Sequence, residues 1–216
     1  MKETETLDHY ISRHIDAEHE YLYRLYRQTN ISLLQGRMAS GHLQGQLLKI
    51  LVEMIRPRNI LEIGTYTGYS ALSMASGLED GGMLYTFDIN DEMEDFTRPW
   101  IDNSPWADRV RFLVGDVMER LPQMATPEEL QFDMVFIDGD KRQYVSYYDF
   151  VLPYLSPCAY ILADNTLWDG HVIDPAYDND AQTLGIRAFN DRVAADTSVE
   201  KVILPLRDGL TLIRRH

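Results

Sequence analysis

The sequence predicts an α/β fold: a mostly parallel sheet of seven strands with helices on both faces and an antiparallel last strand. Short apolar runs of strand length alternate with segments whose apolar residues recur at helical spacing, which is typical of repeated βαβ units. Near the end, two strand-like runs are separated only by a short turn at 205–209. They should form a hairpin, so the final strand reverses direction.

Composition sets the broad class of protein. The 216 residues suffice for one domain with a full core. A net charge of −14 argues against nucleic acid held mainly by phosphate contacts, although a local basic patch is compatible with it. The lone Cys158 excludes an intrachain disulfide and a thiolate metal cluster. No apolar run approaches the roughly 20 residues of a membrane span, and the charged amino terminus is unlike a signal peptide, so we expect no membrane contact and a cytoplasmic location.

The amino-terminal segment 1–37 is expected to be a helical extension of a domain that spans the whole chain. A helix is predicted over 4–29, where apolar residues recur at roughly helical spacing. It should pack on the outside of the domain or against a second subunit. A loop at 38–46 then leads into a helix, with Ser40 as a plausible cap and Pro57 as its stop.

From residue 59 onward, strands and helices alternate. Strands are predicted at 59–63, 83–88, 109–114, 132–137, 159–164, 199–204 and 208–214, and helices at 69–77, 91–102, 117–121, 142–152 and 181–195. In open α/β sheets, ligands bind at the carboxyl ends of the strands. The residues that directly follow each strand are therefore the candidates for a site.

A glycine-containing turn follows the first strand. Its pattern, Gly64 to Gly68, lacks the spacing of a dinucleotide fingerprint and the lysine of a phosphate-binding loop. The adjacent acid, Glu62, should repel phosphate and favour a cationic ligand. Asp88 ends the next strand, where an acid is placed to bind ribose hydroxyls. Together these features predict S-adenosylmethionine rather than NAD. Asp116, after the third strand, either reaches the adenine edge or caps the next helix.

Polar residues also follow two later apolar strands abruptly. Asp138, Asp140 and Lys141 come after one strand, and Asp164 and Asn165 come after the next. If the two strands are neighbours, Asp138, Asp164 and Asn165 converge on one point. Three oxygen donors at one point suit a hard cation. The sequence therefore predicts a divalent-metal site beside the cofactor site.

Several motifs appear in order from about residue 38 to the end. They are Gly45-Gln46, Leu61-Glu62-Ile63-Gly64, Thr67-Gly68-Tyr69-Ser70, Phe136-Ile137-Asp138 with Asp140-Lys141, Asp164-Asn165-Thr166-Leu167-Trp168, Phe189-Asn190 and Asp208-Gly209-Leu210-Thr211-Leu212. With them the chain resembles the cation-dependent class I O-methyltransferases, the caffeoyl-CoA and catechol O-methyltransferase group. The resemblance implies a seven-stranded, Rossmann-like methyltransferase sheet, S-adenosylmethionine as methyl donor, and commonly a homodimer.

The resemblance also implies roles for the matching residues. Asp138, Asp164 and Asn165 resemble the metal ligands, usually for Mg²⁺, with Mn²⁺ or Ca²⁺ as alternatives. Lys141 resembles the general base, acting beside Asp138. The residues that resemble cofactor contacts are Ser40, Glu62, Gly64, Thr65, Ser70, Asp88, Asp116 and Asp140. Trp168 resembles a substrate-lining tryptophan. Asp169 follows it where the family often has Asn, which leaves selectivity open.

The expected function is therefore S-adenosylmethionine- and divalent-metal-dependent methylation of a hydroxyl on a small catechol-like or phenolic acceptor. Aromatic residues in the loop at 166–180 suit a flat ring. Two residues stay open: His171 either lines the site or lies at the surface, and Arg187 either meets an anionic substrate or pairs with a carboxylate. An alternative is a tRNA hydroxyuridine O-methyltransferase, which the acidic charge disfavours. A non-catalytic cofactor-binding protein is a third reading.

Overall fold

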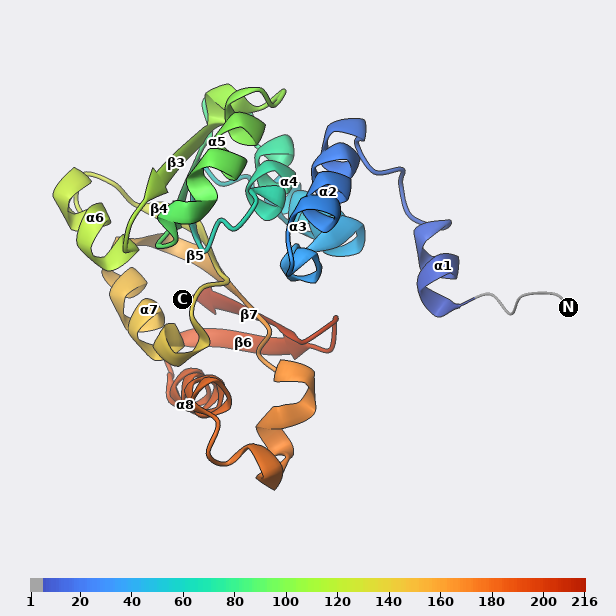
Figure 1. The fold of residues 1–216 in the computed structure, drawn as a ribbon. Coiled ribbons are helices and arrows are strands. Elements are labelled where there is room, and N and C mark those ends of the chain that lie inside the picture. The colour runs from blue at the N-terminus through green and yellow to red at the C-terminus, as the bar shows by residue number, and fades with distance from the viewer. Residues whose placement is uncertain (1–5) are drawn as a thin grey trace, which may run out of the picture.

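A sheet of seven strands forms the centre of the computed structural model, which describes residues 6–216 (Figure 1). The strands are β1 Asn59–Ile63, β2 Met83–Asp88, β3 Val110–Val114, β4 Phe132–Ile137, β5 Leu155–Asp164, β6 Val199–Leu204 and β7 Leu210–Arg215. Their order is β3-β2-β1-β4-β5-β7-β6. Only β7 runs antiparallel to its neighbours, so the predicted mostly parallel sheet with a reversed last strand is confirmed.

Eight α-helices accompany the sheet in the described part of the chain. They are α1 Leu7–Ser12, α2 Glu20–Ser32, α3 Gly41–Ile55, α4 Tyr69–Gly77, α5 Glu94–Asp102, α6 Val117–Met124, α7 Tyr144–Val151 and α8 Ala181–Ala195. Helices α2 to α5 bury apolar residues in one core cluster and α6 to α8 in the other. The helices therefore cover both faces of the sheet, as predicted (Figure 1).

The strands near the middle of the sheet supply both core clusters. On β1, Ile60 belongs to the cluster with α2 to α5, whereas Leu61 and Ile63 belong to the cluster with α6 to α8. On β4, Phe136 and Ile137 divide in the same way. Side chains alternate between the faces of a strand, so a strand covered on both sides is mostly apolar. This is why apolar residues dominate these two segments, with Glu62 in β1 and Asp133 in β4 as the acidic exceptions.

The amino-terminal segment differs from its prediction. Instead of one helix over 4–29, the structure has two, α1 and α2, while residues 4 and 5 lie outside the described residues. α1 buries no residue and lies apart from the sheet (Figure 1). It therefore has no contact with the core that would stabilise a longer helix. α2 buries Leu22 and Leu25 in the core cluster of α3 and α4. Part of the expected outer extension thus belongs to the core.

Two further local predictions were wrong. Ser40 makes no side-chain capping bond because its φ of −56° and ψ of −37° are already helical, whereas a cap needs extended backbone. β5 begins at Leu155 rather than 159, since Leu155 pairs with Phe132 across an irregular register. Among the described residues, no helix is long and apolar enough to cross a membrane.

Candidate active site

Strand register brings the predicted site residues into one row. Ile63 pairs with both Phe87 of β2 and Ile137 of β4, and Ile137 pairs with Ala163 of β5. One position further along, at the carboxyl edge of the sheet, stand Gly64, Asp88, Asp138 and Asp164. The strand order reverses between β1 and β4, which is where open α/β sheets bind ligands. The expectation that the strands before Asp138 and Asp164 are neighbours is confirmed.

Gly64 brings the glycine turn against the end of β4. Its φ is +101°, and a Cβ there would lie 2.3 Å from the carbonyl oxygen of Asp138. Its N–H donates to Phe87 O at 2.8 Å, while the N–H of Asp138 donates to Ile63 O at 2.8 Å. Only glycine combines this backbone conformation with so close an approach. The predicted cofactor turn and the predicted metal strand therefore share one junction.

Asp88 holds the glycine turn in shape. Its Oδ2 accepts hydrogen bonds from the backbone N–H groups of Thr65 at 3.1 Å and Tyr66 at 2.6 Å, and its Oδ1 accepts one from Asn90 at 2.9 Å. Burial nevertheless raises the pKa of Asp88, and the negative charge of Asp138 adds to the rise. The carboxylate lies at the expected edge of the sheet, and its contact with ribose stays a prediction.

Glu62 lies beneath the turn rather than on its surface. It is fully buried, and its carboxyl accepts hydrogen bonds from the hydroxyls of Ser70 at 2.6 Å and Thr86. Burial is the main cause that raises the pKa of Glu62 to about 8. The raised pKa weakens the argument that the charge of Glu62 repels phosphate, because burial disfavours the charged form. Direct cofactor contacts by Glu62 and Ser70 stay predictions.

Of three other predicted cofactor residues, two have side-chain partners within the protein. Asp116 caps α6 by accepting from the N–H of Met118 at 2.9 Å, which is the second of its two expected roles. Asp140 forms two hydrogen bonds of 3.0 Å and one of 2.5 Å with the guanidinium of Arg142, which holds the pKa of Asp140 low. Ser40 is buried at the start of α3. None of these placements tests a cofactor contact.

Lys141 is the centre of the predicted catalytic group. It is only 8% exposed, and its Nζ donates to Asp138 Oδ1 and to the hydroxyl of Tyr144, each at 2.7 Å. The ring of Trp168 lies 6.0 Å away. Tyr144 itself donates to the carbonyl of Asp164 at 3.0 Å, and burial raises its pKa well above 10. Sequence reasoning missed Tyr144, although its place three residues after Lys141 was a usable signal.

The predicted metal ligands fit a hard cation by the chemistry of their oxygens. Burial, and secondly the charge of Asp138, raise the pKa of Asp164 to about 6; a cation between the two carboxylates would relieve this repulsion. Within residues 6–216, no three His, Cys, Asp or Glu side chains gather as a possible metal site. The predicted ligand set contains only two acidic residues, Asp138 and Asp164. The amide oxygen of Asn165 is therefore needed as its third oxygen ligand.

The segment after β5 is ordered by short turns of 3-10 helix, η6 Trp168–Ile173 and η7 Pro175–Tyr177. Trp168 packs partly buried against the core, while Asp169 is exposed with a left-handed φ of 50°. His171 is half-buried and stacks on Tyr177 with ring centres 3.5 Å apart. Substrate contacts by Trp168 and Asp169 stay predictions.

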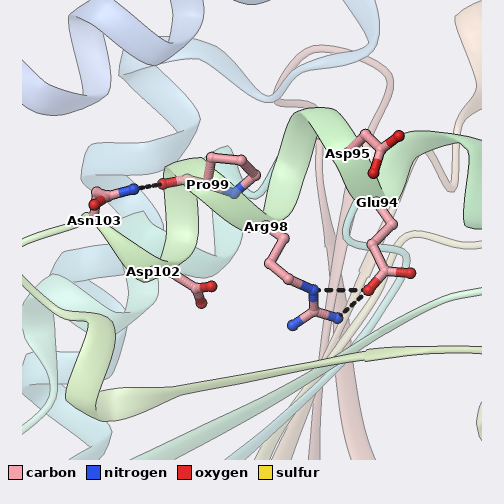
Figure 2. Close-up of a pocket in the computed structure, with 6 residues that line it drawn as sticks. All are labelled: Glu94, Asp95, Arg98, Pro99, Asp102 and Asn103. Carbon is pink, nitrogen blue, oxygen red and sulfur yellow. Dashed lines mark hydrogen bonds and ion pairs between the residues drawn. The ribbon is translucent and has the colours of Figure 1, made fainter.

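A surface hollow on α5 lies outside this site. It is lined by Glu94, Asp95, Arg98, Pro99, Asp102 and Asn103. Figure 2 shows Arg98 bonded to Glu94, with distances of 2.7 and 2.6 Å from its Nε and Nη2. None of the predicted site residues lines this hollow, so it is not part of the candidate active site at the sheet edge.

Comparison with known proteins agrees with this geometry. The sequence profile of the O-methyltransferase family matches residues 11–216. The chain belongs to the O-methyltransferase family. A catechol O-methyltransferase from Niastella koreensis is 34% identical over 216 residues, covering 96% of each chain. Caffeoyl-CoA O-methyltransferase 2 from Eucalyptus globulus is 34% identical over 183 residues, covering 80% of this chain and 72% of that protein.

Solved structures of O-methyltransferases share the fold. The O-methyltransferase from Bacillus cereus in complex with SAH has a TM-score of 0.89 at 30% identity, covering 97% of each chain. One from Streptomyces achromogenes in complex with SAM has a TM-score of 0.87 at 29% identity, covering 97% of this chain and 95% of that one. The chain is therefore an S-adenosylmethionine-dependent O-methyltransferase with the predicted Rossmann-like fold.

Proposed function

We propose that this O-methyltransferase methylates a hydroxyl of a small catechol-like or phenolic acceptor and needs a divalent cation, with Mg²⁺ as the first candidate. The observation that carries the proposal is the junction of Asp138, Lys141 and Asp164 beside the glycine turn. It puts a buried amine and two carboxylates next to the predicted donor site. The similarity to catechol and caffeoyl-CoA O-methyltransferases supports the same class of acceptor.

In this proposal each residue has a defined task. Asp138, Asp164 and Asn165 would hold the cation, which when bound would lower the pKa of an acceptor hydroxyl. Lys141 would act in its neutral amine form, with Nζ taking the hydroxyl proton. The acceptor oxygen gains the methyl group of S-adenosylmethionine, and S-adenosylhomocysteine leaves. Trp168 provides a flat apolar wall beside Lys141. Holding both reactants in one orientation would provide most of the acceleration.

A methyl-transfer assay with labelled S-adenosylmethionine tests the proposal. It compares a panel of catechols and monophenols with bulk tRNA, with Mg²⁺ and with EDTA. We expect transfer to catechols that EDTA abolishes and Mg²⁺ restores. Asp138→Ala and Asp164→Ala should abolish transfer while S-adenosylhomocysteine still binds.

Two results would contradict parts of the proposal separately. Full activity in EDTA would exclude the proposed requirement for a cation. Transfer to tRNA alone would exclude the small acceptor and favour the tRNA hydroxyuridine alternative. The homodimer and the cytoplasmic location expected from the sequence stay predictions. Light scattering coupled to gel filtration tests the homodimer directly.

A further inference from the structure

The turn between β6 and β7 lies against the segment that carries two of the proposed cation ligands. The carbonyl of Asp208 accepts the N–H groups of Leu167 at 2.7 Å and Trp168 at 3.1 Å, and the carbonyl of Gly209 accepts the N–H of Thr166 at 3.1 Å. A Cβ on Gly209 would lie 2.5 Å from the Leu167 side chain. The hairpin tip and the end of β5 are therefore one packed unit, although no role has been assigned to this tip.

One residue of the tip orients Asn165. The Nδ2 of Asn165 donates to Asp208 Oδ2 over a long 3.4 Å, and the backbone of Asn165 is left-handed, with φ of 57°. A carboxylate accepts hydrogen bonds and donates none when ionised. Asp208 therefore favours the amide rotamer whose NH₂ group faces the hairpin. The oxygen of Asn165, the atom that a cation needs, is then turned away from Asp208.

The neighbouring residue acts on Asp164 through a third side chain. Arg207 donates from Nη1 to Gln44 Oε1 at 3.0 Å, and Gln44 donates from Nε2 to Asp164 Oδ2 at 2.6 Å. Gln44 is only 2% exposed. A guanidinium has no acceptor, so Arg207 fixes the oxygen of Gln44 on its own side and leaves the NH₂ for Asp164. The other carboxylate oxygen of Asp164 accepts the N–H of Asn165 at 2.8 Å.

We propose that Arg207 and Asp208 are positioning residues for the cation site. Arg207 sets the carboxylate of Asp164 through Gln44, and Asp208 sets the amide of Asn165. The inference deepens the proposed function and rests on its cation. Partners of metal ligands commonly contribute about 10- to 100-fold to metal affinity. Two adjacent residues on one turn would therefore control both ligands at the end of β5.

Direct binding of Mn²⁺, followed by the electron paramagnetic resonance signal of the free ion, tests the proposal. Asp208→Ala and Gln44→Met should each weaken Mn²⁺ binding by about 10-fold or more, while S-adenosylhomocysteine affinity stays unchanged. Asp208→Asn keeps an acceptor oxygen but adds an NH₂ donor that an ionised carboxylate lacks, so it should restore part of the lost affinity. This rescue separates orientation of Asn165 from a plain loss of negative charge. High Mg²⁺ should restore methyl transfer in Asp208→Ala.

Glu200→Ala is the matched control, because Glu200 lies on the same hairpin in an exposed ion pair with Arg214. It should leave Mn²⁺ affinity unchanged. If Gln44→Met unfolds, Arg207→Gly replaces it, since φ of 50° at Arg207 suits glycine. Thermal unfolding without cation identifies any variant that loses its fold.

The outcomes distinguish this inference from the proposed function. If Asp138→Ala weakens Mn²⁺ binding but Asp208→Ala and Gln44→Met bind it like the wild type, the positioning role is wrong and the cation site stands. If wild-type protein binds no Mn²⁺, or Asp138→Ala leaves binding unchanged, the cation and this inference both fail.

Discussion

The buried side chain of Lys141 makes two hydrogen bonds. Its Nζ lies 2.7 Å from Asp138 and from the Tyr144 hydroxyl, and little of the side chain reaches solvent. A buried amine needs such partners, because an unsatisfied buried polar group is costly. The same position places a potential base beside the predicted acceptor. Single substitutions can therefore test the catalytic role of one residue and the structural role of another.

Lys141→Met should remove the proton acceptor while keeping the length of the side chain. We expect kcat to fall by about 10²- to 10⁴-fold, with S-adenosylhomocysteine affinity unchanged. Steady-state kinetics and calorimetric titration measure the two effects. Lys49→Met, which removes an exposed lysine paired with Glu53 on α3, should leave kcat unchanged. A Lys141→Met variant with wild-type kcat would exclude the base role.

Gly64→Ala tests the close approach of the glycine turn to β4. The added Cβ would collide with the carbonyl of Asp138, and φ of +101° strains any L residue. Gly81 is a matched control, because its φ is +84° but nothing lies within 4 Å of its added Cβ. Strain alone costs about 1–2 kcal/mol. Urea unfolding should show a larger loss for Gly64→Ala than for Gly81→Ala, and equal losses would contradict the collision.

Arg187 of α8 makes several hydrogen bonds to the segment after β5. Arg187 donates from Nε to Val172 O and from Nη2 to the carbonyls of His171 and Asp174, each at 2.9 Å, and its Nη1 pairs with Asp178 at 2.6 Å. Of the two expected roles, pairing with a carboxylate is the one found in the structure. The guanidinium thereby ties η6 and η7 to the helix.

Arg187→Lys should loosen this segment, because an ammonium cannot reproduce the planar fork of donors. We expect the KM for the acceptor to rise by about 10-fold, since a group worth about 1.4 kcal/mol changes binding tenfold. Affinity for S-adenosylhomocysteine should stay unchanged, and limited proteolysis within 166–180 should accelerate. Arg192 lies on the same helix and pairs with other carboxylates. Arg192→Lys is therefore the control. An unchanged acceptor KM would argue against a role of this segment in acceptor binding.

Glu62 links β1 to β2 and α4, and its raised pKa makes stability depend on pH. The folded pKa is about 8 against an ordinary value of 4.5, so the folded state holds a proton that the unfolded chain has released between these pH values. The contribution of Glu62 is therefore full below about pH 4.5 and falls as pH rises to about 8.

Glu62→Gln imitates the protonated side chain and should remove this dependence. Relative to wild type, the variant should be more stable at pH 8.5 than at pH 5.5, by an amount on the order of a few kcal/mol, because one pKa unit corresponds to about 1.36 kcal/mol. Urea unfolding of both proteins at the two pH values measures the difference. Parallel pH profiles would show that Glu62 titrates normally.

The candidate active site lies at one edge of the sheet, whereas the net negative charge is a property of the whole molecule. The formal net charge is −14. Excess charge of one sign destabilises a compact state by self-repulsion, and salt screens it. Bound cations would add a separate, local stabilisation at the carboxylates after β4 and β5.

Sodium chloride should therefore raise the melting temperature of wild-type protein at low ionic strength. At matched ionic strength, Mg²⁺ should raise it further in the wild type but not in Asp138→Ala, because binding to the folded state alone adds stability. Scanning fluorimetry measures both effects. A melting temperature that is indifferent to salt would argue against net repulsion.

Local patterns predicted much of the fold. β2, β4, β6, α4 and α8 have the bounds expected from apolar runs and helical spacing. Predictions were wrong where tertiary packing intervenes. The described part of the segment predicted as one helix over 4–29 contains two helices, α1 and α2, and α1 buries no residue. Ser40 stands at the N-cap position of α3 but makes no capping hydrogen bond, because its own backbone is already helical.

By itself, the sequence determined the fold class, the row of acids at strand ends and the family, because each depends on residue types at short spacing. Tertiary structure decided which side chains hold those acids. Gln44 meets Asp164 across 120 residues of chain and Arg207 across 163. Such contacts leave no local periodicity, because they are set by strand order and by helix packing rather than by neighbours in sequence. The raised pKa of Glu62 likewise follows from burial, which only the folded sheet creates.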